Sequence, residues 1–513
     1  MNLVTGLLLS QLAVQDPATA PAPAAEKPAP PPASRSLQLR VMVVAALQNN
    51  LALRSARAST SSVETGIQAA KSVFDPFLQL APSFSEGDRS PLVEPGLILS
   101  GNERSTQLSA GVNGMLPWST SYAVSLDGSR RRQDNPLLLA PGELTPTANT
   151  SLTLTLAQPL LRGFGPGIAQ APVRQARLFA SSSRAQLDRL TEQVIADVES
   201  AYWNLGLAAA FERISRESYE RAQELMSRNE RMRELNLISE VDAITSRRGV
   251  QQRLTTLTEA TRRRKDAAER LIFLVFGESA ERYLDPDLDF GTEPPPEQAP
   301  ALPELAELER AALGTRSDLR AARFDVDQGE VATRIARNAL LPDARLSLSY
   351  AAQTLGTADY RLFSVQRPGD LEANDWRVGV ALSYPLWNRA ARAANARATH
   401  DLEASQTALA SAEQFVRSDV RSAARAIATN LERLEQARLS FDYARQQYDA
   451  GERQLQLGLV DSFRLLQMEE EVSSAALVFE QTRYDLALAI SNFELAMGTN
   501  RRKYGAPTAE GGP

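Results

Sequence analysis

Residues 416–434 read VRSDVRSAARAIATNLERL, and this stretch decides the architecture of the chain. Its apolar residues recur every three or four positions, which predicts a helix with one narrow apolar stripe. Neither proline nor glycine interrupts residues 390–450, so the helix is predicted to be long. A long helix of this kind forms no globular core alone and must pack against neighbours, including neighbours from other chains. The stripe consists of Val416, Val420, Ala423, Ile427, Leu431 and Leu434.

The same spacing marks two further segments, residues 187–208 and 472–493. Long helices are therefore predicted over residues 168–235 and 388–456, and the first would measure ~100 Å at ~1.5 Å per residue. Each is followed by a return helix of about half that length. The predicted return helices span residues 240–276 and 462–497.

Two other helical segments supply the missing length. We expect residues 315–340 to complete the first long helix and residues 37–73 to complete the second, so that the two halves interlock. The proline-rich stretch 285–303 then interrupts the helices near mid-height. The lengths predict an elongated helical cylinder with an irregular belt around its middle.

Paired motifs in the same order indicate a tandem duplication. QPLLR at 158–162 matches YPLWNR at 384–389, LNLIS at 235–239 matches LGLVD at 457–461, and NNLAL at 49–53 matches RSDL at 316–319. The first segment holds an apolar run of signal-peptide length without a basic start, followed by a Pro/Ala linker. The predicted organisation is a signal segment and linker over 1–36, a first repeat over 37–276, an equatorial linker over 277–314, a second repeat over 315–499 and a flexible tail over 500–513.

Short alternating segments separate the helices in both repeats. Such segments are typical of strands with one apolar face, and a membrane strand needs ~9–11 residues of this kind. Beyond the N-terminal run, no stretch of ~18 apolar residues is present, so a membrane crossing would require a closed barrel. One chain offers too few strands for a wide barrel, so closure would need several chains. The predicted strands cover residues 75–84, 106–116, 119–126, 149–157, 344–350 and 375–384.

Composition excludes several classes of function. The net charge is −6 and the basic residues are spread along the chain, which disfavours a nucleic-acid partner. There is no cysteine and a single histidine, His400, so thiolate sites, histidine triads and multi-histidine zinc sites are excluded. The run Glu469 to Glu471 points around a helix and does not converge. We therefore predict no enzymatic activity, no cofactor and no metal site.

The motifs and their order resemble those of the TolC family of outer-membrane efflux proteins. The resemblance covers about residues 37–499 and rests on order and spacing across both repeats. The segments that carry it are 46–53 (ALQNNLAL), 158–163 (QPLLRG), 201–203 (AYW), 318–319 (DL), 384–386 (YPL) and 457–461 (LGLVD).

This resemblance implies a mainly α fold with a β-barrel contribution. Tandem-duplicated helical hairpins of three chains would form an α-barrel tunnel in the periplasm, and at least four transmembrane strands per chain would share one barrel in the outer-membrane lipid. It implies an outer-membrane channel of a tripartite efflux or type I secretion system. The homotrimer would passively conduct substrate received from an inner-membrane pump through a periplasmic adaptor protein.

Two features depart from the family pattern. Residues 106–126 form an apparent extra hairpin, so the four strands per chain of the family are expected to be exceeded. The first hairpin tip has Asn236 where the second has Gly458, and asparagine tolerates left-handed backbone less well than glycine.

The turns between long and return helices are the candidate functional sites. They are either plain connectors or, as the resemblance implies, the adaptor-docking tips, with apolar side chains as knobs. The tip residues are Asn236, Leu237, Ile238, Ser239, Gly458, Leu459, Val460 and Asp461.

Charged residues beside the tips form a candidate pore gate. A ring of carboxylates in a trimeric pore would attract cations and could pair with arginines, although a solvated helix face explains any single one of them. The gate candidates are Glu240, Asp242, Asp461, Arg233 and Arg453.

A structural coiled-coil protein of the envelope, without channel activity, is the alternative function. The alternating strand segments disfavour it, since a spacer does not need them.

Overall fold

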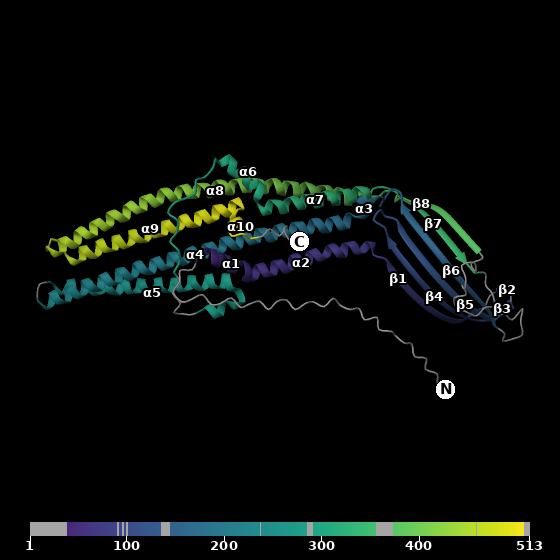
Figure 1. The fold of residues 1–513 in the computed structure, drawn as a ribbon, viewed down its shortest axis with the longest axis horizontal. Helices are drawn as coiled ribbons and strands as arrows, with labels where there is room; N and C mark the ends of the chain where they lie inside the picture. The colour runs from purple at the N-terminus through teal and green to yellow at the C-terminus, as the bar shows by residue number, and fades with distance from the viewer. Residues whose placement is uncertain are drawn as a thin grey trace, which may run out of the picture.

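The computed structural model describes residues 38–506 except 90–91, 95–96, 99–100, 135–143, 236–237, 285–290, 355–372 and 458. The molecule is elongated, with helices over most of its length and a sheet at one end (Figure 1). No helix in these ranges is long and apolar enough to cross a membrane.

Two long helices run the length of the helical part. α4 (Ala171–Glu234) and α8 (Arg389–Gln456) have 64 and 68 residues, and their return helices α5 (Glu240–Phe276) and α9 (Ser462–Met497) have 37 and 36. The predicted helix lengths and the half-length return legs are therefore confirmed.

The shorter helices lie in line with the return legs (Figure 1). α1 (Leu39–Asn49) and α2 (Leu51–Lys71) pack on α4 beyond the end of α5, and α7 (Ser317–Asn338) packs on α8 beyond the end of α9. Irregular elements fill the middle. They are η2 (Gly277–Tyr283), α6 (Leu305–Thr315) and α10 (Asn500–Lys503), while η1 (Ser72–Phe74) and α3 (Pro166–Ala169) lie next to the sheet.

The predicted interlocking of the two repeats is wrong for the N-terminal helix. α1 and α2 pack on α4 of their own repeat, where Val43 and Leu53 join a core with Ile195 and Leu271. α7 is in line with α9 and not with α5, and it contacts both α4 and α8, so the prediction that residues 315–340 complete the first hairpin is also wrong. The two long helices differ by only four residues, so lengths alone did not determine which one each short helix would join.

The N-terminal helix is also divided, at Asn50. The side-chain oxygen of Asn50 accepts hydrogen bonds from the backbone N–H groups of Ala52 (3.0 Å) and Leu53 (3.2 Å). Asn50 is therefore the N-cap of α2. Its amide nitrogen donates to the carbonyl of Leu274 on α5 (2.9 Å). One side chain therefore caps α2 and attaches it to the end of the return helix.

The sheet has six antiparallel strands in the order β1-β4-β5-β6-β7-β8. All six strands predicted from alternation are present, and the expectation of at least four per chain is confirmed. A short pair, β2 (Leu92–Glu94) with β3 (Leu97–Ile98), was not predicted. The six strands are β1 (Phe77–Arg89), β4 (Gly101–Met115), β5 (Ser121–Asp134), β6 (Leu144–Pro159), β7 (Asp343–Gln353) and β8 (Ala373–Ser383).

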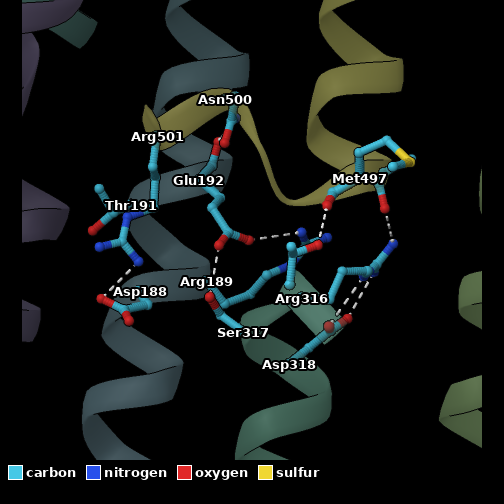
Figure 2. A network of polar contacts seen from close by, with 12 residues as sticks. Asp188, Arg189, Thr191, Glu192, Arg316, Ser317, Asp318, Met497, Asn500 and Arg501 are labelled. Atoms are coloured by element: carbon cyan, nitrogen blue, oxygen red, sulfur yellow. Dashed lines mark hydrogen bonds and ion pairs between the residues drawn. The ribbon is translucent and has the colours of Figure 1, made fainter. Parts of the chain in front are cut away.

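A network of buried charges holds the belt at mid-height (Figure 2). Asp188 of α4 pairs with Arg320 of α7 and with Arg501 of α10, both at 2.8 Å. The Glu192 carboxylate accepts from the Ser317 hydroxyl at 2.6 Å, and burial raises the pKa of Glu192 against the lowering effect of this bond.

Arg316, next to Ser317 in the chain, extends this network toward α8 and α9, and its side chain is 1% exposed. Its guanidinium pairs with Asp318 (2.7 Å) and Asp419 (2.6 Å) and donates to the Ala496 carbonyl (3.2 Å). The network therefore connects α4, α7, α8, α9 and α10.

The start of the predicted flexible tail belongs to this belt. Asn500 is fully buried and donates to the Glu192 carbonyl at 2.7 Å, and Arg501 is 5% exposed. Residues 500–506 are therefore ordered in the structure, and polar composition alone gave no sign of these partners.

Replacing Asp188→Ala should strongly destabilise the protein. The buried Arg501 and the partly buried Arg320 would lose their shared carboxylate, and removing one partner of a buried ion pair costs about 3–5 kcal/mol. The thermal unfolding midpoint of the purified protein measures this loss. Asp197→Ala on the exposed side of the same helix is the control and should leave the midpoint nearly unchanged. Equal midpoints for the two variants would contradict the assigned role of the network.

Candidate functional site: the strand wall and the hairpin tips

One face of the sheet is apolar across all six strands. The strand registers align even-numbered residues throughout, for example Leu80↔Ala110, Val124↔Leu154 and Leu348↔Val378. The side chains on this face are exposed in the single chain. They include Leu78, Leu80, Phe84, Val112, Val124, Leu152, Leu154, Leu346, Leu348, Trp376, Val378, Val380 and Leu382.

The opposite face carries small and polar residues. Odd-numbered positions pair there in the same registers, as in Ser125↔Thr153 and Ser347↔Gly379. A sheet with one apolar and one polar face is the pattern of a membrane barrel wall, whose outer face meets lipid and whose inner face meets water. We call this sheet of six strands the strand wall.

The strand wall is joined rigidly to the helices. Gly163 and Gly165 adopt positive φ values of 83° and 89°, which let the chain turn sharply between β6 and α4. The Gly163 N–H donates to the Asn338 side chain at 2.7 Å, and Arg162 pairs with Asp343 at 2.6 Å. The two repeats are therefore connected to one another at the junction of sheet and helices.

The hairpin tips lie at the opposite end of the molecule (Figure 1). Of the predicted tip residues, Asn236, Leu237 and Gly458 lie outside the described residues. Leu459 is 71% exposed, Ser239 and Asp461 are exposed, and Ile238 and Val460 are half-buried.

Other apolar side chains at the tips were missed by the sequence analysis. Val241 and Ile244 on the first turns of α5 and Phe463 on the first turn of α9 are exposed. Ala243 and Leu465, close to them in sequence, are buried, so the exposed residues lie outside the buried stripe of each return helix. Val241 and Ile244 are three residues apart and out of phase with the buried stripe of α5, and this signal was available in the sequence.

Two of the acidic gate candidates act as helix caps. Asp242 and Ser239 form a capping box at the start of α5, and the Asp461 carboxylate accepts from the Arg464 N–H at 2.8 Å. Glu240 is exposed on the first turn of α5. Within the chain, as far as it is described, neither Arg233 nor Arg453 pairs with these acids.

A buried ion pair lies further from the tips, where the two hairpins touch. Arg253 of α5 pairs with Glu469 of α9, and their side chains are 8% and 4% exposed. The Glu469 carboxylate also pairs with Arg221 of α4 (3.1 Å) and accepts from the Ser473 hydroxyl (2.8 Å). This group, here called the hairpin lock, connects the first hairpin to the second.

The hairpin lock was not among the predicted sites. Glu469 was considered only within a run of three glutamates that point around the helix. The structure shows that Glu469 points inward, whereas the side chain of Glu470 remains 66% exposed. No group of three or more His, Asp or Glu residues able to hold a metal occurs among the described residues.

Comparisons with known proteins agree with this architecture. Residues 308–499 match the model of the outer membrane efflux protein family. No curated protein matches the chain. Among solved structures, the outer-membrane channel OprN shares the fold with a TM-score of 0.65, 19% identity, and coverage of 93% of this chain and 95% of that one.

Two further channels show the same similarity. The CmeC outer membrane channel of Campylobacter jejuni gives a TM-score of 0.64 at 16% identity, covering 90% of this chain and 86% of its own. The MtrE outer membrane channel of Neisseria gonorrhoeae gives 0.62 at 16% identity, covering 90% and 89%. The family consists of channel proteins, not enzymes. The second repeat therefore matches the outer membrane efflux protein family, and nearly the whole chain shares the fold of these outer-membrane channels.

Proposed function

We propose that three copies of this chain form an outer-membrane channel that passively conducts substrate from a periplasmic adaptor and an inner-membrane pump to the exterior. The observation that carries the proposal is the strand wall. Its apolar face spans all six strands, and its edge strands β1 and β8 have no strand neighbour on their outer sides within the described sheet. An open edge is not tolerated in lipid, so further copies must close it.

The helical part also requires further copies. α8 has 68 residues but buries few of them, while the side chains of Phe415 and Tyr443 are 64% and 66% exposed. α4, of similar length, buries many more because α2, α5, α7 and α9 all pack on it. The open flank of α8 therefore supports packing against a neighbouring copy in a homotrimer.

The exposed apolar face of the strand wall disfavours the alternative function, a coiled-coil spacer without channel activity. A coiled-coil spacer in the periplasm would leave the whole apolar face of the strand wall in water, at a cost of about 25 cal/mol for each Å². The protein should migrate as a heat-modifiable trimer from the outer-membrane fraction and conduct ions in a planar bilayer. A monomer in the periplasmic fraction would overturn the proposal.

The hairpin tips are proposed as the docking surface for the adaptor. Leu459, Val241, Ile244 and Phe463 present apolar side chains on short, capped turns at the end furthest from the sheet. Such exposed apolar side chains on rigid elements are suited to bind a groove on a partner. In the proposed trimer, the gate candidates beside the hairpin tips would surround the periplasmic entrance.

Leu459→Asp should weaken export while leaving the trimer in the outer membrane. Loss of one apolar anchor typically costs about 2 kcal/mol of binding free energy, or about thirtyfold in Kd. Export by cells and pull-down of the purified adaptor measure the effect. Leu459→Met, which keeps the apolar volume, is the matched control. Normal export by the Asp variant would mean that this tip is only a connector.

The double variant Asp242→Asn with Asp461→Asn tests the acidic entrance. Asparagine preserves capping at Asp461 and can accept the Ser239 hydrogen bonds at position 242, so the hairpin tips should keep their shape while each trimer loses six charges. The preference of the channel for cations should fall, as read from the reversal potential in a salt gradient. Asp266→Asn, on the exposed body of α5, is the control. An unchanged reversal potential would exclude the entrance role.

Glu469→Gln should open the entrance by breaking the hairpin lock. The buried Arg253 and the partly exposed Arg221 would lose their shared carboxylate, so the contact between the hairpins would weaken. Single-channel conductance should rise several-fold. Glu470→Gln is the matched control. Glu470 is the next residue in the chain, its side chain is exposed, and its ion pair with Arg253 is the longer contact, at 3.3 Å. If the two variants conduct alike, the hairpin lock does not hold the entrance.

A further inference from the structure

The β4–β5 hairpin is built into the strand wall along its full length. β4 pairs with β1 from Phe77↔Asn113 to Arg89↔Gly101, and β5 pairs with β6 from Ser121↔Ala157 to Asp134↔Leu144. A plug or a flap would have one free side and would not continue the register of both neighbours. The hairpin is therefore a part of the strand wall.

The faces of the hairpin agree with those of its neighbours. Its even-numbered residues, such as Val112 and Val124, lie on the apolar face beside Leu78 and Leu154. Its odd-numbered residues lie on the polar face. They include Gln107, Ser109, Asn113, Ser125, Asp127 and Ser129. The hairpin therefore adds lipid-facing area outside and polar lining inside.

The edge strands can close the sheet between copies. β1 runs away from the helices and β8 runs back toward them, so β8 of one copy would meet β1 of the next in the antiparallel sense found between all the other strands. Leu80 and Val380, exposed by 65% and 69%, lie on the same apolar face at the two edges. Closure would therefore make the apolar face continuous around a ring.

We infer that three copies close one barrel of eighteen strands, and that the β4–β5 hairpin sets the width of the exit. The inference rests on the proposed trimer. It follows from the six strands that each chain contributes and from the absence of a strand partner at either edge of the described sheet. An even number of antiparallel strands closes without a mismatched seam.

The influence of the hairpin on the width of the barrel can be estimated from the spacings of strands and helices. Eighteen strands spaced by ~4.8 Å and tilted by ~40° give a circumference of ~110 Å, whereas twelve give ~75 Å. Each chain provides four columns of helices, namely α4, α8, α2 with α5, and α7 with α9 (Figure 1). Twelve columns spaced by ~9 Å have a circumference of ~110 Å. The helix circumference passes through the helix axes, so the bore of the tunnel is narrower than this figure suggests, and the eighteen-stranded exit is at least as wide as the tunnel. A wall without the hairpin would narrow the exit by about a third.

The width of the exit has a consequence for the cargo. Solutes that fill the helical tunnel would leave through a barrel lined by serine, threonine and small residues together with charged side chains such as Asp127, Arg131 and Arg345. The barrel is thus suited to bulky, hydrated solutes, for which a narrower wall would be the limiting constriction.

Two adjacent substitutions on the added hairpin test this placement. Ser125→Arg would put a cation on the inner face, so trimers should assemble while conductance and cation preference fall. Val124→Arg would put the same charge toward lipid, so the yield of membrane-inserted trimer should fall several-fold. If Ser125→Arg assembles and conducts as the unchanged protein does, the hairpin does not line the exit and the inference is wrong.

Strand counting by electron cryomicroscopy of the unchanged trimer gives an independent result. Eighteen strands are expected, and removal of residues 101–134 should leave twelve and lower the largest polymer that enters the channel by about a third in diameter. A conducting trimer with a twelve-stranded wall would overturn this inference alone. An unchanged protein that forms no conducting trimer would instead overturn the proposed function and the inference with it.

Discussion

The structure depends on apolar surfaces that one chain is unable to cover. α8 carries a stripe that its own partners bury only in part, and the strand wall carries an apolar face with nothing packed on it. Both surfaces are narrow or one-sided, so neither can collapse into a core of its own. The elongated shape of the chain and its proposed packing against further copies both follow from this constraint.

Buried charges then fix how the helices are arranged. Narrow stripes of alanine, valine and leucine are poor at specifying which neighbour a helix chooses, because many registers bury similar areas. The belt network around Asp188 and Arg316 allows few alternatives, since each buried charge must meet its partner. The hairpin lock at Glu469 has the same role nearer the hairpin tips, where apolar burial is sparse. We therefore attribute the alignment of the two repeats to these polar groups. The stability of the folded repeats is attributed mainly to apolar packing.

Helices and strands could be predicted from the periodicity of the sequence, whereas contacts between residues far apart in the chain could not. Helix lengths and six strands followed from spacing alone, since the pattern of a stripe or an alternation is local. The partner of α2 did not follow, because α4 and α8 offer nearly equal lengths. Arg501 and Glu469 looked like ordinary surface residues, and only their partners, which lie far away in sequence, make them structural. The exposed apolar side chains Val241 and Phe463 could have been found by comparing the phase of each return helix with its buried stripe.

The geometry of the tips separates two ways in which charge can control an entrance. The carboxylates of Asp242 and Asp461 are held by backbone and hydroxyl donors at helix N-termini, so they are fixed in place and stay near solvent. Acids held in this way attract cations but do not bind the two hairpins to each other. Glu469, in contrast, contacts Arg253 and Arg221 from a second helical hairpin while nearly excluded from water, so its charge bears directly on how the hairpins are held. We therefore propose different residues for selectivity and for closure: the acidic caps would govern which ions enter, and the hairpin lock would govern whether the entrance is open.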